Sequence, residues 1–312
     1  MKIRVARRSD KEIILQFCTN TFSWGDYIDK VFDIWYAEPY GRLLVADTGG
    51  NIRNKDEQYK AATAIAVSHV VSCPDKKRIW IEGIRVHPSY RRHRVATALI
   101  GKMLQYGKQQ GAKEASAIIS SRNIASQSLF KNNGFEIVSK WRYYKIPIYN
   151  KINEVRNSKI NTRIASLKDI DDIWNYLRFS ETYRLSGKLY FNAWRWYPLN
   201  YKTILDFIKK QRLIVTENNR STIKGVAIVN KEGYWNRTNI FQIVYLDSTS
   251  LFSLQNLISF CTKICFTSTY NNERHKFDQL QILSYQNKQL LVVMSNITVK
   301  ESEQFFLYSR HL

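Results

Sequence analysis

Hydrophobic and polar positions in the first 150 residues alternate between two spacings. Short alternating or apolar runs, typical of strands, recur between stretches whose apolar residues lie three or four positions apart, as on amphipathic helices. The pattern predicts strands at 3–6, 43–46, 62–71, 78–86, 115–119, 135–138 and 141–146. It predicts helices at 12–20, 27–36, 95–109 and 124–132.

A polar stretch, Tyr149–Lys159, separates this pattern from a second one. We therefore expect domains at 1–149 and 161–312, joined by a linker at 150–160. Three segments of the second half resemble segments of the first in the same order: Thr162–Asp169 with Ile3–Asp10, Arg212–Glu217 with Arg42–Asp47, and Lys224–Val229 with Lys60–Ile65. This order predicts a diverged duplication, and chance similarity between amphipathic strands is the alternative.

The composition is that of a globular protein, with 44% hydrophobic and 24% charged residues in 312. No run of apolar residues is long enough for a membrane span, and the basic start lacks the apolar core of a signal peptide, so we expect a cytoplasmic protein without a membrane partner. The four cysteines are too few and too scattered for a disulfide framework or a zinc site, so no metal is expected.

The net charge of +22 is spread over the whole chain. Residues 1–150 hold 25 Lys and Arg against 13 Asp and Glu, and residues 151–312 hold 23 against 13. Such a charge favours polyanions, which include nucleic acid, an acidic membrane surface and a phosphorylated cofactor, without choosing among them.

The most informative segment lies between Ile79 and Ile100. An apolar strand ends at Pro88, a short basic turn follows, and an amphipathic helix begins at Val95. A turn of this kind points several backbone N–H groups at one spot beside the positive end of the helix dipole, which is a site for phosphate. Arg91, Arg92 and Arg94 would add positive charge around it.

This segment resembles the GCN5-related N-acetyltransferase (GNAT) superfamily. The pyrophosphate loop of that superfamily reads Arg/Gln-x-x-Gly-x-Gly/Ala, and residues 91–96 read Arg-Arg-His-Arg-Val-Ala. Asn123, Leu129-Phe130 and Gly134-Phe135 resemble the segment that follows it. The resemblance covers about residues 1–148 and implies an α/β (α+β) fold with a mixed, mostly antiparallel sheet. In a tandem arrangement, the C-terminal half would be a second, degenerate domain of the same kind.

The resemblance implies that a primary amine attacks acetyl-coenzyme A (acetyl-CoA) directly in a ternary complex. Main chain near Val86 would hold the pantetheine arm, and the turn at 91–96 would hold the pyrophosphate. The implied cofactor-binding residues are Arg85, Val86, Arg91, Arg92, His93, Arg94, Val95, Ala96, Thr97, Asn123 and Phe130.

Acetyl transfer needs an amine that has lost its proton, so a base is useful. Glu82 is the only carboxylate on the 78–86 strand, and members of the superfamily often place a base there. An ion pair between Glu82 and Arg85 or another basic neighbour is the alternative. Asp26 and His69 are reserve candidates, although a histidine between apolar strand residues is more often a packed one.

Two positions depart from the superfamily pattern. Arg94 stands in place of a glycine, where backbone approaches phosphate closely. Phe130 stands where many members have a tyrosine that protonates the departing thiolate. Tyr143 or Tyr144 could take that role, although aromatic residues on a strand are more often core.

The segment Phe22–Ile28 loosely resembles N-acetyltransferase-like proteins for histidine and other amino acids, which have two domains in tandem. Trp24, Asp26 and Tyr27 would then bind the acceptor, which favours a small amino acid or related amine, with a protein amine next. The second half has Asp247–Leu251 where the basic turn would be, so it would complete the acceptor pocket or bind a partner. The alternative function is an inactive scaffold that binds nucleic acid or the ribosome through its basic surface.

Overall fold

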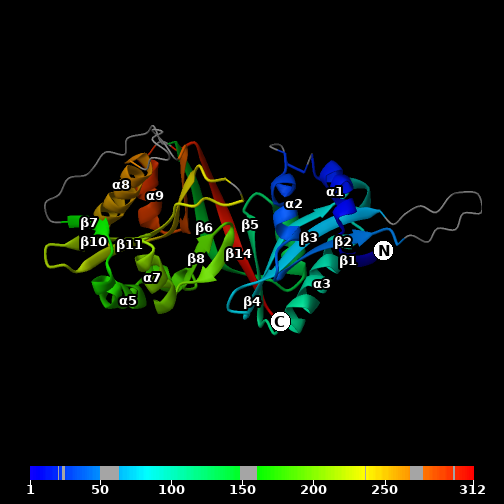
Figure 1. Ribbon diagram of the computed structural model, residues 1–312, viewed down its shortest axis with the longest axis horizontal. Helices are drawn as coiled ribbons and strands as arrows, with labels where there is room; N and C mark the ends of the chain where they lie inside the picture. The colour runs from blue at the N-terminus through cyan, green and yellow to red at the C-terminus, as the bar shows by residue number, and fades with distance from the viewer. Residues whose placement is uncertain are drawn as a thin grey trace, which may run out of the picture. The chain divides into compact units, whose positions relative to one another are not determined.

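The computed structural model describes residues 1–19, 21–22, 25–49, 63–147, 160–235, 237–267, 277–297 and 299–312 (Figure 1). They form two compact units. Unit 1 consists of residues 1–119, 123–136 and 308–312, and unit 2 consists of residues 120–122 and 137–307.

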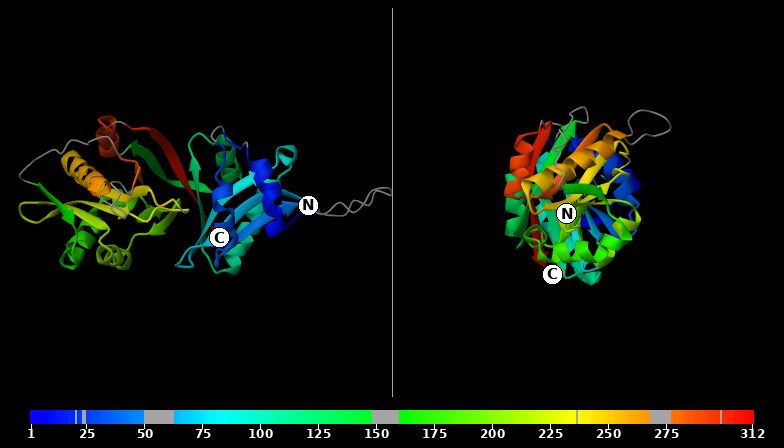
Figure 2. Two further views of the ribbon diagram at one scale, coloured as in Figure 1. Left: turned by 45° about the horizontal axis from the view of Figure 1, so that its top comes forward. Right: turned by 90° about the vertical axis from the view of Figure 1, so that its left-hand side faces the viewer.

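Unit 1 is built on a sheet with helices on both faces. Its strands are β1 (Lys2–Val5), β2 (Gly41–Asp47), β3 (Ala64–Ser72), β4 (Arg78–Val86), β5 (Glu114–Ser120) and the end of β14 (Glu301–His311). Its helices are α1 (Lys11–Cys18), α2 (Ile28–Tyr36), α3 (Val95–Gln109) and α4 (Ile124–Asn132). Helices α1 and α2 lie on one side of the strands and α3 on the other (Figures 1 and 2). Neighbouring residues of β3 show this alternation, because Ser68 contacts Met103 of α3 and His69 stacks on Trp35 of α2.

Strands β4 and β5 run parallel but pair over only three residues, from Arg78 with Glu114 to Trp80 with Ser116. Beyond this point β4 continues to Val86 without pairing to β5, and we call this divergence the unit 1 fork. Gly83 in β4 has a φ of +69°, at the position where the register against β3 shifts. A Cβ on Gly83 would lie 2.5 Å from the Trp35 ring, so only glycine fits there.

Unit 2 repeats this plan. The main sheet has the order β6-β13-β12-β11-β10-β7, with a parallel pair β12–β13 and antiparallel neighbours otherwise. Its strands are β6 (Glu136–Pro147), β7 (Ile160–Ile164), β10 (Leu213–Asn218), β11 (Ile223–Asn230), β12 (Ile240–Ser248) and β13 (Gln279–Tyr285), and a separate hairpin joins β8 (Leu189–Asn192) to β9 (Arg195–Pro198). Its helices are α5 (Ile170–Phe179), α6 (Glu181–Leu185), α7 (Tyr201–Lys209), α8 (Leu251–Thr267) and α9 (Lys288–Ser295). In Figure 1, α8 and α9 cover one side of these strands, and α5 and α7 the other.

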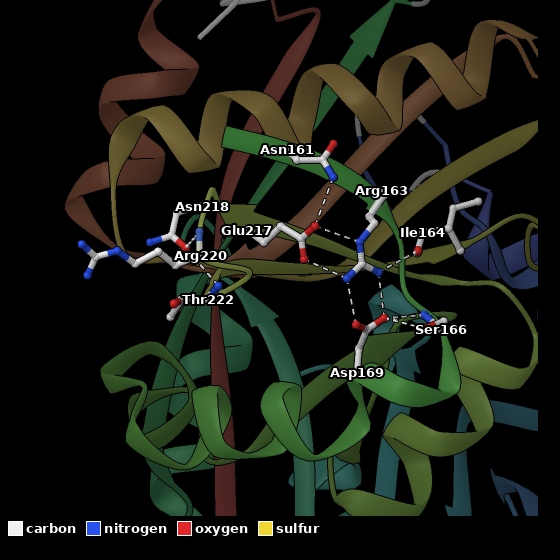
Figure 3. Close-up of polar contacts among 9 residues, drawn as sticks. All are labelled: Asn161, Arg163, Ile164, Ser166, Asp169, Glu217, Asn218, Arg220 and Thr222. Atoms are coloured by element: carbon white, nitrogen blue, oxygen red, sulfur yellow. Dashed lines mark hydrogen bonds and ion pairs between the residues drawn. The ribbon is translucent and has the colours of Figure 1, made fainter. Parts of the chain in front are cut away.

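An arginine held by two carboxylates occurs once in each unit. In unit 2, Arg163 of β7 bonds Asp169 at 2.7 and 2.8 Å and Glu217 at 2.8 and 3.1 Å (Figure 3). In unit 1, Arg4 of β1 bonds Asp10 at 2.7 and 2.8 Å and Asp47 at 2.7 Å. We call these groups the Arg4 and Arg163 clamps.

The strand registers align the two units residue by residue. Val45 pairs with Arg4 on one side and Val67 on the other, and Val215 pairs with Arg163 and Val226 in the same way. The next register shift also recurs, between Ala46 and Asp47 and between Thr216 and Glu217. Two of the three predicted sequence matches therefore have the correct register.

The third predicted match, between Lys224–Val229 and Lys60–Ile65, is wrong in register. Because Val226 is equivalent to Val67, Gly225 is equivalent to Ala66 and not to Ala61. Alternating apolar patterns look alike after a shift of the strand, which is why the sequence misleads here. Residues 60–62 lie outside the described part of the chain.

The limits of the compact units differ from the predicted domain limits in two places, at β6 and at the last residues of the chain. The predicted strands at 135–138 and 141–146 form the single strand β6, most of which belongs to unit 2, and residues 308–312 belong to unit 1. The last residue shows this, since the Leu312 amide donates to the Lys113 carbonyl at 3.0 Å. Most of the expected linker, 150–159, lies outside the described residues. Within the described residues, no helix is long and apolar enough to cross a membrane.

Candidate functional site

The basic turn between β4 and α3 has the backbone of an anion site. Pro88–Tyr90 form a short 3₁₀ turn, after which Arg92 and Arg94 adopt left-handed φ angles of 64° and 58°. Arg94 therefore has the backbone conformation that the expected glycine would adopt. In a residue other than glycine this left-handed conformation costs about 1–2 kcal/mol. Arg94 precedes α3 directly, and its own side chain does not cap the helix. The first N–H groups of α3 are therefore left for a ligand or water.

Positive side chains surround these amides. Arg91, Arg92, His93 and Arg94 are all exposed, and the Arg91 Nε donates to the Val86 carbonyl at 3.3 Å. Val95 is buried and begins the stripe that packs α3 against the sheet, whereas Ala96 is half-buried and Thr97 exposed. A concentrated positive charge at a helix N-terminus, next to the unit 1 fork, suits a pyrophosphate group.

Asn123 and Phe130, two of the predicted cofactor-binding residues, have structural roles. The Asn123 Oδ1 accepts a hydrogen bond from the Ser126 amide at 3.0 Å and so caps α4. Phe130 of α4 is buried, and its ring packs against Phe135 and Tyr308 with centroid distances of 4.9 and 6.2 Å. Its ring is thus part of the core of unit 1.

Glu82 points into a polar cluster on the α2 side of the sheet. Its Oε1 lies 2.9 Å from Nδ1 of His69, a fully buried residue of β3. The other ring nitrogen of His69 has the Oε2 of Glu38 at 3.5 Å, which is too long for a hydrogen bond. The His69 ring stacks on Trp35 at 4.8 Å, and a Cβ on Gly41 would lie 2.6 Å from its Nε2. The packing therefore fixes the orientation of the imidazole between two carboxylates.

Arg85 pairs with Asp26 and not with Glu82. The basic neighbour of Glu82 is His69, so an ion pair with another basic residue stays an alternative role for this carboxylate. The guanidinium of Arg85 binds Asp26 through two bonds of 2.7 and 3.1 Å, and the rings of Phe22 and Tyr27 lie 4.9 and 5.1 Å from it. Burial opposes the charge of Arg85, but Tyr27 and Asp26 more than offset it and raise its pKa. The Oδ1 of Asp26 also accepts the amides of Tyr27 and Ile28 at the start of α2.

The predicted acceptor residues Asp26 and Tyr27 thus lie together with Arg85, and Trp24 lies outside the described residues. Tyr27 is half-buried, desolvation of its hydroxyl raises the pKa of that group, and its ring meets Trp35 edge-on at 6.0 Å. The Asp26 carboxylate is occupied by Arg85 and by the helix start. Its direct contribution is to hold Arg85 and α2 in place.

Tyr143 and Tyr144 belong to unit 2, whereas Glu82 belongs to unit 1. Both tyrosines are buried on β6, and burial raises the pKa of each hydroxyl. The Tyr143 ring packs against Trp194 at 5.5 Å, and Tyr144 is part of the apolar core beneath α8 and α9. Their surroundings are those of core residues.

Sequence reasoning missed Glu38 and Tyr308. Glu38 follows α2 and has no motif around it, so only the fold brings it to His69. Tyr308 is fully buried beside Phe130, and its hydroxyl has no hydrogen-bond partner among the described residues. No local signal could place it there, because it lies 178 residues after Phe130 in the chain (308 minus 130).

Part of the chain is similar in sequence to known proteins. Residues 12–135 match the Acetyltransferase (GNAT) family. An aminoglycoside N(6')-acetyltransferase type 1 of Salmonella typhimurium is 31% identical over 85 residues, which are 27% of this chain and 59% of that protein, and the Salmonella enteritidis protein matches equally. The chain thus spans less than two thirds of the length of these relatives.

Solved structures of low identity share the fold over the whole chain. A GCN5-related N-acetyltransferase from Sphaerobacter thermophilus has a TM-score of 0.63 at 12% identity, over 99% of this chain and 95% of that one. A tandem GNAT protein from the clavulanic acid biosynthesis pathway has a TM-score of 0.55 at 10% identity, over 99% and 98%. These likenesses extend the fold to unit 2, as the repeated clamps do.

Proposed function

We propose that the chain, whose residues 12–135 match the acetyltransferase (GNAT) family, transfers an acetyl group from acetyl-CoA directly to a primary amine. The observation that carries the proposal is the uncapped, basic start of α3 beside the unit 1 fork. It lies inside the region that matches the family. Acetyl-CoA would supply an activated acetyl thioester.

The residues of the turn fit the anionic part of this cofactor. The amides at the start of α3 hold the pyrophosphate, with Arg91, Arg92, His93 and Arg94 around it. Arg94 does not exclude the group by its backbone, because it has the left-handed conformation that a glycine would supply. Beyond Trp80, the edge of β4 that faces away from β3 does not pair with β5, so its main-chain groups could meet an extended pantetheine arm.

Glu82 accepts the proton of the attacking amine in this proposal. His69 acts as a positioning residue, since it is fixed by Trp35 and bonds the carboxylate through Nδ1. Glu38 beyond it would stabilise positive charge on the imidazole when a proton arrives at the pair. Asp26 holds Arg85 of β4 and the start of α2 together in this part of the unit.

The acceptor is proposed to be a small molecule with a primary amine, such as an amino acid or the amino group of an aminoglycoside. The last class is the acceptor named for the 31% identical relatives. We keep the cytoplasm as the proposed compartment. Nucleic acid as a partner has only the net charge of +22 in its favour.

The test is release of free coenzyme A from acetyl-CoA, measured with a thiol reagent against a panel of amino acids, aminoglycosides, polyamines and peptides. We expect turnover with one class of amine, and acetyl-CoA should raise the melting temperature of the protein. An absence of both effects, together with tight RNA binding that weakens as salt rises, would overturn the proposal in favour of a nucleic-acid-binding scaffold.

A further inference from the structure

Unit 2 contains a pocket with a buried carboxylate. The pocket has a volume of about 1350 Å³ and lies where β12 and β13 end, next to α5, α6 and the start of α9. Asp247, near the end of β12, lines it and is only 2% exposed. Strands β12 and β13 diverge here as β4 and β5 do, because their pairing stops at Ile243 with Ile282. We call this place the unit 2 fork.

Asp247 occupies the position that Arg85 has in unit 1. Arg85 pairs with Val67, and Asp247 pairs with Val226, the residue equivalent to Val67. The sign of the charge at this position is therefore reversed between the units. The segment equivalent to the Asp26 loop is the junction of α5 and α6, and this junction faces Asp247 in unit 2.

The partners of the two charges differ in kind. Arg85 has the carboxylate of Asp26 as its counter-charge. Asp247 has only hydroxyl donors, from Tyr245 at 3.1 Å and from Ser180, Tyr176 and Thr182. No lysine, arginine or histidine forms an ion pair with it among the described residues. A buried carboxylate without a cation is costly, and burial accordingly raises the pKa of Asp247.

The charged residues of the lining are Asp172, Glu181 and Asp247 against Arg220 and Lys288. Apart from Asp247 the two signs balance, so the lining as a whole has a surplus of one negative charge, whereas the chain has a net charge of +22. The volume is ample for a small organic ligand.

We propose that this pocket binds a small molecule through a primary ammonium group, which pairs with the Asp247 carboxylate. The ammonium group of the ligand is the counter-charge for Asp247 in unit 2, as the Asp26 carboxylate is for Arg85 in unit 1. The hydroxyls of Tyr176, Ser180 and Thr182 hold the carboxylate in place for this pair. The site is separate from the acetyl-CoA turn and needs no acetyl transfer to be occupied.

The test uses the full chain and calorimetric titration with 1,4-diaminobutane, with 1,4-butanediol as its neutral counterpart. We expect the diamine to bind at least tenfold more tightly than the diol. Asp247→Asn should weaken diamine binding at least tenfold, because the amide keeps the shape and loses the charge. The control is Asp206→Asn, which changes an exposed aspartate of α7 outside the pocket and should leave binding unchanged.

Glu82→Gln separates this site from the acceptor site of unit 1. Diamine binding that persists in Glu82→Gln and is lost in Asp247→Asn supports the proposal. Diamine binding that survives Asp247→Asn overturns it, as does an equal affinity of the wild-type chain for diamine and diol. The last comparison needs no variant, so it remains decisive even if Asp247→Asn fails to fold.

Discussion

The two forks share a backbone plan and differ in charge. In unit 1, the last four residues before α3 are exposed, and three of them are arginines. In unit 2, β12 ends in Asp247-Ser248, Thr249-Ser250 follow, and the Ser250 Oγ accepts the amide of Ser253 at the start of α8. The first arrangement attracts an anion, and the second caps its own helix. A duplicated fold can thus keep its frame while the chemistry at equivalent positions is inverted.

The frame is best seen in the clamps. Arg4 with Asp10 and Asp47 has the same strand register as Arg163 with Asp169 and Glu217, and in both clamps the aspartate follows the arginine by 6 residues. In both clamps the aspartate also accepts a backbone amide, from Arg7 and from Ser166. Neither clamp belongs to a fork, so we assign to both the structural task of tying the first strand to the turn that follows it.

The largest effect is expected at Glu82. In the proposed function the Glu82 carboxylate takes the amine proton, so Glu82→Gln should lower kcat by about 10²–10⁴-fold. Acetyl-CoA affinity should stay unchanged, since the turn is untouched. Asp247→Asn is the matched change in unit 2 and should leave kcat near the wild-type value. Steady-state kinetics check both, and an unchanged kcat in Glu82→Gln removes Glu82 as the base.

A substitution at Gly83 should cost more stability than a substitution at the register shift of β12 in unit 2. Gly83→Ala places a Cβ against Trp35 at a left-handed φ, so we expect a loss of about 2–4 kcal/mol in the free energy of unfolding. Val244 lies at the register shift between β12 and β11, and Val244→Ala should cost about 1–2 kcal/mol. Urea denaturation measures both. Equal losses would mean that Trp35 moves away easily.

The clamps should differ in strength because they differ in exposure. The Arg4 side chain is 14% exposed and the Arg163 side chain 34%. Arg4→Met should cost about 2–3 kcal/mol, since it leaves two carboxylates unpaired. Arg163→Met should cost only about 1 kcal/mol after solvent screening. A larger loss in Arg163→Met, measured by urea denaturation, would reverse this order.

The clamps also predict a pH dependence. The arginine hydrogen bond outweighs burial and lowers the pKa of Glu217, and hydrogen bonds from Arg4 and Arg7 together offset the burial of Asp10 and lower its pKa. A carboxylate whose folded pKa is depressed adds stability above its unfolded pKa and loses it as the pH falls through the folded value. Wild-type stability should therefore fall between about pH 5 and pH 2, and less steeply in Arg4→Met. Parallel slopes would exclude the clamp as the cause.

The smallest effect is expected from a single charge in the turn. Arg92→Glu should weaken acetyl-CoA binding about tenfold, which corresponds to about 1.4 kcal/mol. The effect should shrink at high salt, because Arg92 is exposed. Arg178→Glu makes the same change at an exposed site of unit 2 and serves as the control. An equal loss in both variants would show that only net charge matters.

The sequence predicted local features well and non-local pairings poorly. The strand, basic turn and helix around 79–109 follow from consecutive residues, and so does the absence of such a turn after β12. The partner of Glu82 did not follow, because the shifted register between β3 and β4 brings His69 opposite to it. The carboxylate of Asp247 was visible in the sequence, but its burial was not, since the hydroxyls around it come from α5, α6 and β12.

The central claim is that the chain has one cofactor site, at the turn of unit 1. Calorimetric titration of the intact chain with acetyl-CoA tests it most directly. The account predicts one molecule bound per chain, with affinity reduced by Arg92→Glu and unchanged by Asp247→Asn. Two molecules per chain, or binding that Asp247→Asn weakens and Arg92→Glu does not, would contradict it.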